Sequence, residues 1–101
     1  MKTLLPLLDA SELQEGQSRS VQAHGRTFAV FRQGGQFYAM DDECPHVGAP
    51  LGSGFLEEGQ VVCSFHGWTF DLKTGACLTG GDCRVKTYPV RVREGKVEIE
   101  L

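Results

Sequence analysis

The chain has 101 residues, which is enough for one domain with a modest core. Hydrophobic residues make up 41% of it and charged residues 23%, as in ordinary soluble globular proteins. The net charge of −3 argues against a nucleic-acid partner, because phosphate binding requires a basic surface.

The amino-terminal part opens with a short apolar stretch, Leu4–Leu8, that is far too short to span a membrane. No later stretch of the sequence approaches such a span, so we expect a cytoplasmic protein without a membrane partner. Residues 9–13 then predict one helical turn, with Asp9 or Ser11 as its N-cap and Gly16 as its end.

Short strands separated by glycine turns follow. Residues 21–23 and 26–32 flank His24-Gly25, which is typical of a β-hairpin. Apolar residues on both faces of the second strand predict that it lies in the interior of the structure. Another strand, residues 36–40, begins after Gly34-Gly35.

The carboxyl-terminal part predicts a second hairpin. Residues 86–93 alternate in polarity, Glu94-Gly95 turns the chain, and residues 97–101 alternate on the return. Pro89 cannot donate a ladder hydrogen bond, so we expect its strand near a sheet margin. Short strands with little helix predict an all-β fold, either an antiparallel β-sandwich or a partly open barrel.

Two short motifs carry the chemistry of this chain, because each pairs a cysteine with a histidine. Zinc sites usually draw thiolates from one arm and histidines from the other. Mixed arms are typical of a two-iron cluster in which sulfur ligates one iron and nitrogen the other. A tetrahedral zinc site with two thiolates and two imidazoles is the minor alternative. The four candidate ligands are Cys44, His46, Cys63 and His66.

The pattern Cys44-x-His46, sixteen further residues, and Cys63-x-x-His66 resembles the Rieske family. The resemblance implies one [2Fe-2S] cluster, with Cys44 and Cys63 on the inner iron and His46 and His66 on the outer iron. It also implies a single Rieske domain over residues 1–101. A small cluster-binding subdomain, at about residues 42–69, would be inserted between its strands. The other residues that carry the resemblance are Gly48, Leu51, Gly67, Trp68 and the segment 87–90.

The chain departs from the respiratory Rieske proteins at four positions. Ala49 and Phe65 stand where those proteins have a bracing pair of cysteines, and Trp68 and Phe70 stand where they have a serine and a tyrosine. With fewer hydroxyl donors to the cluster sulfurs, an added electron is less stabilised. We therefore expect a reduction potential at the low end of the Rieske range, which is roughly −150 to +300 mV.

The resemblance further implies a one-electron carrier of a ring-hydroxylating dioxygenase system, with no catalytic residue of its own. It would accept electrons from a flavin reductase and pass them to a terminal oxygenase. His46 and His66 would be the exit points, within an apolar collar of Val47 and Phe65. We expect a monomer. The alternative is the small subunit of an assimilatory nitrite reductase, bound to the large subunit.

Two further features lie outside the ligand motifs. Cys77 and Cys83 could form a disulfide, but a reducing cytosol favours two thiols, with Cys77 packed and Cys83 more exposed. The acidic run Asp41-Asp42-Glu43 is expected to be a solvated charge run that could steer a basic partner.

Overall fold

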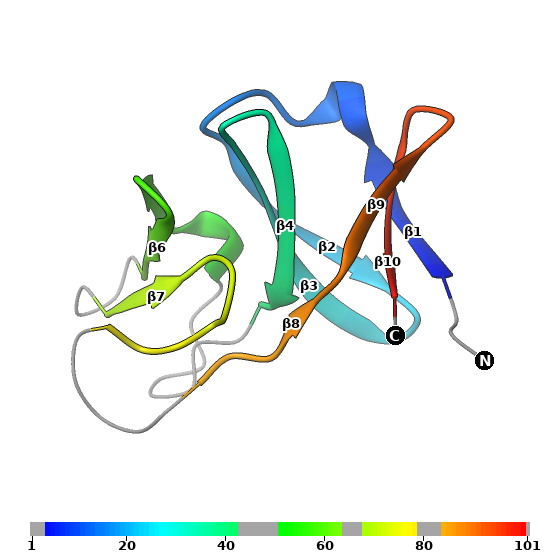
Figure 1. Cartoon of the computed structure of the whole chain (residues 1–101). Coiled ribbons are helices and arrows are strands. Elements are labelled where there is room, and N and C mark those ends of the chain that lie inside the picture. The colour runs from blue at the N-terminus through cyan, green and yellow to red at the C-terminus, as the bar shows by residue number, and fades with distance from the viewer. Residues whose placement is uncertain (1–3, 43–50, 64–67, 79–83, 101) are drawn as a thin grey trace.

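The computed structural model describes residues 4–42, 51–63, 68–78 and 84–100 (Figure 1). Within these residues the chain forms antiparallel strands and two single-turn 3-10 helices. The elements in chain order are β1 (Leu4–Asp9), η1 (Ala10–Glu12), β2 (Ser18–Ala23), β3 (Arg26–Gln33), β4 (Gln36–Asp41), η2 (Leu51–Ser53), β5 (Phe55–Glu57), β6 (Gln60–Val62), β7 (Thr69–Asp71), β8 (Thr87–Tyr88), β9 (Val90–Arg93) and β10 (Lys96–Glu100).

Three small sheets build the molecule. Two of them, in the orders β1-β10-β9 and β2-β3-β4-β8, face one another. The third, β5-β6-β7, lies beside β4 and away from the first sheet (Figure 1). The expected all-β fold, a sandwich or partly open barrel of antiparallel strands, is therefore confirmed.

Strand β3 supports two hydrophobic cores because its alternate residues point to opposite faces. Phe28 and Val30 are fully buried among residues of β1 and β10. Ala29 and Phe31 are fully buried on the other face, against the unit that contains β6 and β7. The interior position expected for this strand is confirmed, and both faces of its apolar pattern are used.

The hairpin turns explain the register of the strands that they join. His24 and Gly25 have φ values of 56° and 72°, and Glu94 and Gly95 have 52° and 76°. Two consecutive residues with positive φ match the right-handed twist of the strands that flank a two-residue turn. Both predicted hairpins are present, and His24 is exposed in its turn.

Pro89 divides what the sequence suggested was one strand. β8 pairs with β4, whereas β9 pairs with β10 in the opposite sheet. The chain thus crosses from one sheet to the other at Pro89, which has no N–H to donate. The apolar stretch at the amino end was not predicted as a strand, yet it forms β1 and pairs with β10, so that Leu8 lies opposite the buried Val97.

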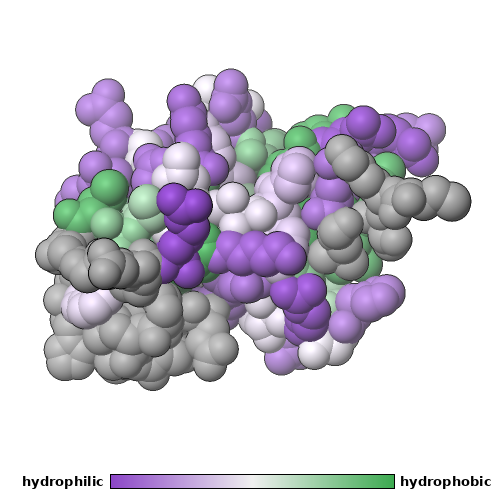
Figure 2. All heavy atoms as spheres, turned by 60° about the horizontal axis from the view of Figure 1, so that its bottom comes forward, coloured by the Kyte–Doolittle hydropathy of each residue, from purple (hydrophilic) through white to green (hydrophobic). Residues whose placement is uncertain are grey.

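The predicted helical turn after β1 is present as the 3-10 helix η1, and the backbone N–H of Asp9 donates to Oε2 of Glu12 at 3.2 Å. Among the described residues, hydrophilic side chains predominate on the face shown in Figure 2, and hydrophobic surface forms separate patches. Among the described residues, no helix is long and apolar enough to cross a bilayer.

Candidate metal centre

Of the four predicted ligands, the structure describes one. Cys63 follows the last residue of β6, and 1% of its surface is exposed. Cys44, His46 and His66 lie outside the described residues. The same holds for Val47, Gly48, Ala49, Phe65, Gly67 and Cys83, to which the sequence also assigned roles.

Cys63 belongs to the core between two sheets. One is β5-β6-β7, called the small sheet below, and the other is β2-β3-β4-β8, called the inner sandwich sheet. It shares a buried cluster with Leu51, Val61 and Phe70, and Trp68 packs half-buried against that cluster. Phe70 is fully buried in this cluster, whereas Trp68 is partly exposed. The surrounding apolar side chains therefore exclude water from the Cys63 thiol on this side.

The backbone beside Cys63 brings two ends of the chain together. The N–H of Cys63 donates to the carbonyl of Trp68 at 2.7 Å. Residues 64–67, which carry the predicted ligand His66, therefore begin and end at adjacent points of the small sheet.

Asp42 brings the two ends of the segment with the first motif together in a similar way. The N–H of Leu51 donates to the carbonyl of Asp42 at 2.6 Å, and the N–H of Gly52 donates to its Oδ1 at 2.8 Å. The hydroxyl of Ser20 donates to the same oxygen at 2.9 Å. Residues 43–50, with Cys44 and His46, thus start and end at this carboxylate.

Asp42 corrects one expectation from the sequence. The run 41–43 was expected to be solvated, but Asp42 is 7% exposed and is the buried charged side chain among the described residues. The Gly52 N–H and the Ser20 hydroxyl, which both donate to this carboxylate, compensate for the loss of hydration. The close approach of this segment to β2 requires Gly52, since a Cβ there would lie 2.6 Å from the carbonyl carbon of Arg19.

The neighbouring Asp41 is also engaged. Its Oδ1 accepts a hydrogen bond of 2.7 Å from the hydroxyl of Tyr88 and lies 3.3 Å from Nη2 of Arg26. Arg26 also donates to the Tyr88 hydroxyl and lies over the rings of Tyr88 and Phe28. Burial, followed by the bond to the Asp41 carboxylate, raises the pKa of Tyr88 above its ordinary value.

Gly75 brings the two ends of residues 75–85, a third segment beside the small sheet, close together. Gly75 has a φ of +75°, and its carbonyl accepts the N–H of Val85 at 2.9 Å. A Cβ at Gly75 would lie 3.0 Å from the carbonyl carbon of Val85, so no other residue fits without a shift. Cys77 follows, half-buried against the same core as Cys63, and Cys83 lies outside the described residues.

The donor chemistry fits an iron–sulfur centre that needs both motifs. No group of three or more metal-ligating side chains comes together among the described residues. A buried thiolate from Cys63 is the ligand type that iron prefers in clusters. The remaining donors would have to come from Cys44, His46 and His66, whose segments are anchored at Asp42 and at Trp68.

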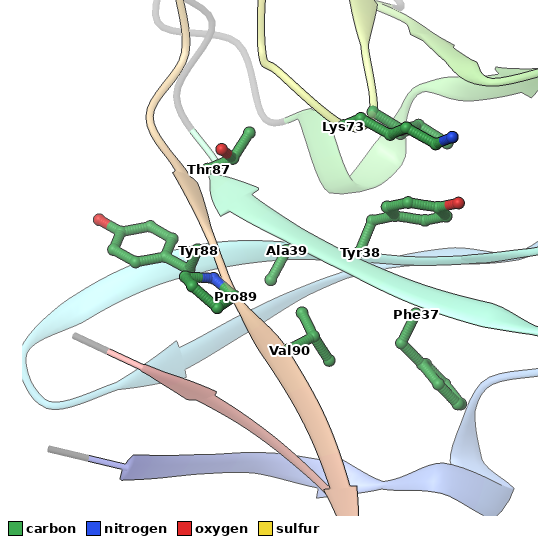
Figure 3. A pocket seen from close by; sticks show the side chains of 9 residues that line it. Phe37, Tyr38, Ala39, Lys73, Thr87, Tyr88, Pro89 and Val90 are labelled. Atoms are coloured by element: carbon green, nitrogen blue, oxygen red, sulfur yellow. The ribbon is translucent and has the colours of Figure 1, made fainter. Parts of the chain in front are cut away.

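An open pocket of about 320 Å³ lies elsewhere, where β8 leaves β4 at Pro89 (Figure 3). Phe37, Tyr38 and Val90 line it, and Lys73 extends over it beside the Tyr38 ring. Cys63 does not line this pocket, so it is separate from the candidate centre.

Comparisons with known proteins agree with the ligand chemistry. The Rieske [2Fe-2S] domain family matches residues 3–89. The chain is 40% identical over 93 residues to the 3-phenylpropionate/cinnamic acid dioxygenase ferredoxin subunit of Photorhabdus laumondii, and the match covers 89% of this chain and 87% of that one.

Two solved structures are similarly close in fold. One is the ferredoxin-sized chain in a complex of reduced oxygenase and oxidised ferredoxin of carbazole 1,9a-dioxygenase, with a TM-score of 0.87, 36% identity, and coverage of 95% of this chain and 91% of that chain. The other, from Mycobacterium tuberculosis, is described as the small subunit of an NADH-dependent nitrite reductase, with a TM-score of 0.90, 25% identity, and coverage of 100% and 96%.

Longer relatives are matched over only a small part of their length. The chain spans 16% of the cholesterol 7-desaturase of Hemicentrotus pulcherrimus and 26% of the 4beta-methylsterol monooxygenase of Methylococcus capsulatus, at 40% and 37% identity. The family match names an iron–sulfur cluster, so the zinc alternative is not supported. This chain belongs to the Rieske [2Fe-2S] domain family, whose cofactor is one [2Fe-2S] cluster.

Proposed function

We propose that this protein is a one-electron carrier, a ferredoxin that takes electrons from a flavin reductase and passes them to a terminal oxygenase of the ring-hydroxylating type. The observation that carries the proposal is that ferredoxin subunits of dioxygenase systems match this chain over nearly their whole length. When bound, the cluster supplies one-electron storage, and no catalytic residue of the protein is required.

We further propose that Cys44 and Cys63 bind the inner iron and that His46 and His66 bind the outer iron. The burial of Cys63 supports this assignment, because the inner position requires a ligand withdrawn from water. The proposed domain organisation is one Rieske domain over residues 1–101 with a cluster-binding subdomain at about 42–69.

What the chain itself contributes is positioning and exclusion of water. The core around Cys63 shields the thiolate, and the anchors at Asp42 and Trp68 fix the ends of both ligand segments. We propose that the carrier works as a cytoplasmic monomer.

A second candidate is the small subunit of an assimilatory nitrite reductase. The observation that favours it is the TM-score of 0.90 to the protein from Mycobacterium tuberculosis. In that case the chain would be a fixed part of a larger enzyme and would bind its large subunit tightly.

Electron paramagnetic resonance of the protein reduced by dithionite tests the proposal. A rhombic signal of a [2Fe-2S] cluster with mixed sulfur and nitrogen ligation is expected, together with acid-labile sulfide. A colourless protein without labile sulfide would refute it. Affinity purification from the source cells separates the two candidates, because stable isolation with a sirohaem subunit supports only the second.

A further inference from the structure

The outer face of the small sheet carries two unusually exposed apolar side chains. Phe55 is 66% exposed and Leu78 is 49% exposed. Among the described residues, Val92 is comparable, at 48%, but it lies on β9 in the other part of the molecule. Large apolar side chains held in water are unfavourable, so a pair of them on one small sheet indicates a contact surface.

The strand register places these two side chains in one row. Phe55 is opposite Val62, and Val62 is opposite Thr69. The N–H of Leu78 donates to the carbonyl of Thr69 at 2.8 Å, which continues the ladder by one more strand-like segment. Residues directly opposite one another share a face of the sheet.

The inner face confirms which way the row points. Val61 and Phe70 are fully buried in the core, and Cys77, which bridges to Phe70, packs against that core. Because side chains alternate between faces along each segment, the neighbours Val62, Thr69 and Leu78 point outward.

The row borders the candidate centre. Val62 immediately precedes Cys63, and Thr69 immediately follows Trp68. Electron transfer weakens steeply with distance, so a partner must approach the proposed outer ligands, one of which, His66, belongs to the segment that joins Cys63 to Trp68 at this end of the sheet. A protein seated there would cover the row from Phe55 to Leu78.

The charges next to the row define the partner. Glu57 and Glu58 are exposed at the β5–β6 turn, and Asp71 lies further across the same face. Arg84 is the basic side chain at the far end of this face, opposite Ala76. Lys73, although near Asp71 in sequence, lies over the pocket beside Tyr38 instead (Figure 3). The Phe55 side of the surface is therefore acidic.

We propose that the row Phe55–Val62–Thr69–Leu78, with its acidic flank Glu57-Glu58, is a docking surface for a redox partner protein. The partner would present an apolar contact bordered by lysine or arginine side chains. This inference rests on the proposed carrier function and adds to it the surface and the chemistry of the partner.

The test compares three variants of the loaded protein: Phe55→Ser, Leu78→Ser and the matched control Val92→Ser. Stopped-flow measurements would follow oxidation of the reduced protein by cytochrome c, a lysine-rich redox protein, and by ferricyanide, a small oxidant that needs no docking. We expect the rate constant with cytochrome c to fall about tenfold in the first two variants and to stay within about twofold in Val92→Ser. With ferricyanide the three variants and the unmodified protein should react with the same rate constant.

Charge is tested separately with the double variant Glu57→Gln, Glu58→Gln. Its rate constant with cytochrome c should fall at low salt and converge with that of the unmodified protein at high salt. Equal cytochrome c rates for Phe55→Ser, Leu78→Ser and Val92→Ser would overturn the docking surface. Failure of every protein to react with ferricyanide after dithionite treatment would instead refute the carrier function.

Discussion

The backbone N–H of Gly52 donates a hydrogen bond of 2.8 Å to Oδ1 of Asp42, and this contact joins the two ends of the segment that carries Cys44 and His46. Ser20 of β2 donates to the same oxygen, so the inner sandwich sheet is tied to the base of that segment. A buried carboxylate with this set of donors links the fold directly to the candidate centre.

Asp42→Ala is expected to lower the free energy of unfolding by about 3 kcal/mol, because it leaves buried donors without their charged acceptor. Asp42→Asn retains one acceptor oxygen and should lose about 1 kcal/mol. Urea unfolding followed by circular dichroism measures both values, and the rate at which visible absorbance bleaches reports on retention of the cluster. Equal stability of Asp42→Ala and the unmodified protein would contradict the anchoring role.

Cys63→Ser should abolish the visible absorbance and the labile sulfide, because the substitution removes a buried thiolate from the proposed ligand set. Cys77→Ser is the matched control, since Cys77 packs against the same core but lies outside the motifs. The control should keep its colour. If both variants bound the same amount of iron and sulfide, the ligand assignment of Cys63 would be wrong.

Tyr88 gives a prediction at alkaline pH. Its pKa is raised above the ordinary value of 10.0, first by burial and then by the Asp41 carboxylate. Its contribution to stability is therefore fully present below pH 10 and is lost as the pH rises through the folded-state pKa.

The chain contains two tyrosines, so the variant Tyr38→Phe leaves Tyr88 as the reporter group. An absorbance titration at about 295 nm should show phenolate appearing above pH 10 in the folded protein and at lower pH in urea. Tyr88→Phe, which removes the bonds to Asp41 and Arg26, should cost about 1–2 kcal/mol. Titration of folded Tyr88 at or below its ordinary value would contradict the buried contact with Asp41.

Glu15 gives a prediction at acid pH. Its Oε2 accepts the N–H of Gly34 at 2.6 Å and its Oε1 accepts that of Gly35 at 3.0 Å. These bonds, the one from Gly35 foremost, lower the pKa of Glu15 below 4.5. The stabilisation is present above the unfolded-state pKa and disappears as the pH falls through the folded-state value.

Glu15→Gln should therefore unfold at a lower urea concentration than the unmodified protein at neutral pH, and the difference should shrink below pH 4.5. Glu58→Gln, at an exposed position of another turn, is the comparison. A difference between the Glu15 variant and the unmodified protein that stayed constant down to acid pH would show that the carboxylate charge is not involved.

The reduction potential follows from the residues around Cys63. Phe70 is fully buried and has no hydroxyl, and Trp68 beside it has none either. We expect a midpoint in the lower part of the range from roughly −150 to +300 mV that is typical of this ligand set. Protein-film voltammetry measures it, and a midpoint well above zero would mean that other donors stabilise the reduced state.

The sequence predicted those parts of the fold whose signals are local. The turns at His24-Gly25 and Glu94-Gly95, the interior position of β3 and the helical turn after Asp9 all follow from neighbouring residues. It did not reveal β1, because Leu4–Leu8 shows no alternation and depends on pairing with β10 at the other end of the chain. Likewise, the sequence did not show that the strand divides at Pro89, because this division depends on the pairing of β8 with β4 and of β9 with β10.

The candidate site was likewise predicted from the sequence only in part. Spacing alone was enough to propose the four ligands. The burial of Asp42 could not be read from an acidic run, because it depends on Ser20 and Gly52, which lie far from it in sequence. The outward row from Phe55 to Leu78 was also missed, since it emerges only when three strands and one loop are placed in register.

The burial of β3 on both of its faces has a consequence for the unfolding of the protein. Its Ala29 and Phe31, together with Met40 of β4, are covered by the unit that holds Cys63, and Phe28 and Val30 are covered from the other side. Separation of that unit would expose to water the face of β3 and β4 that carries Ala29, Phe31 and Met40. Heat or denaturant should therefore melt both halves in a single cooperative step, and a shortened chain without residues 43–85 should aggregate rather than persist as an independent sandwich.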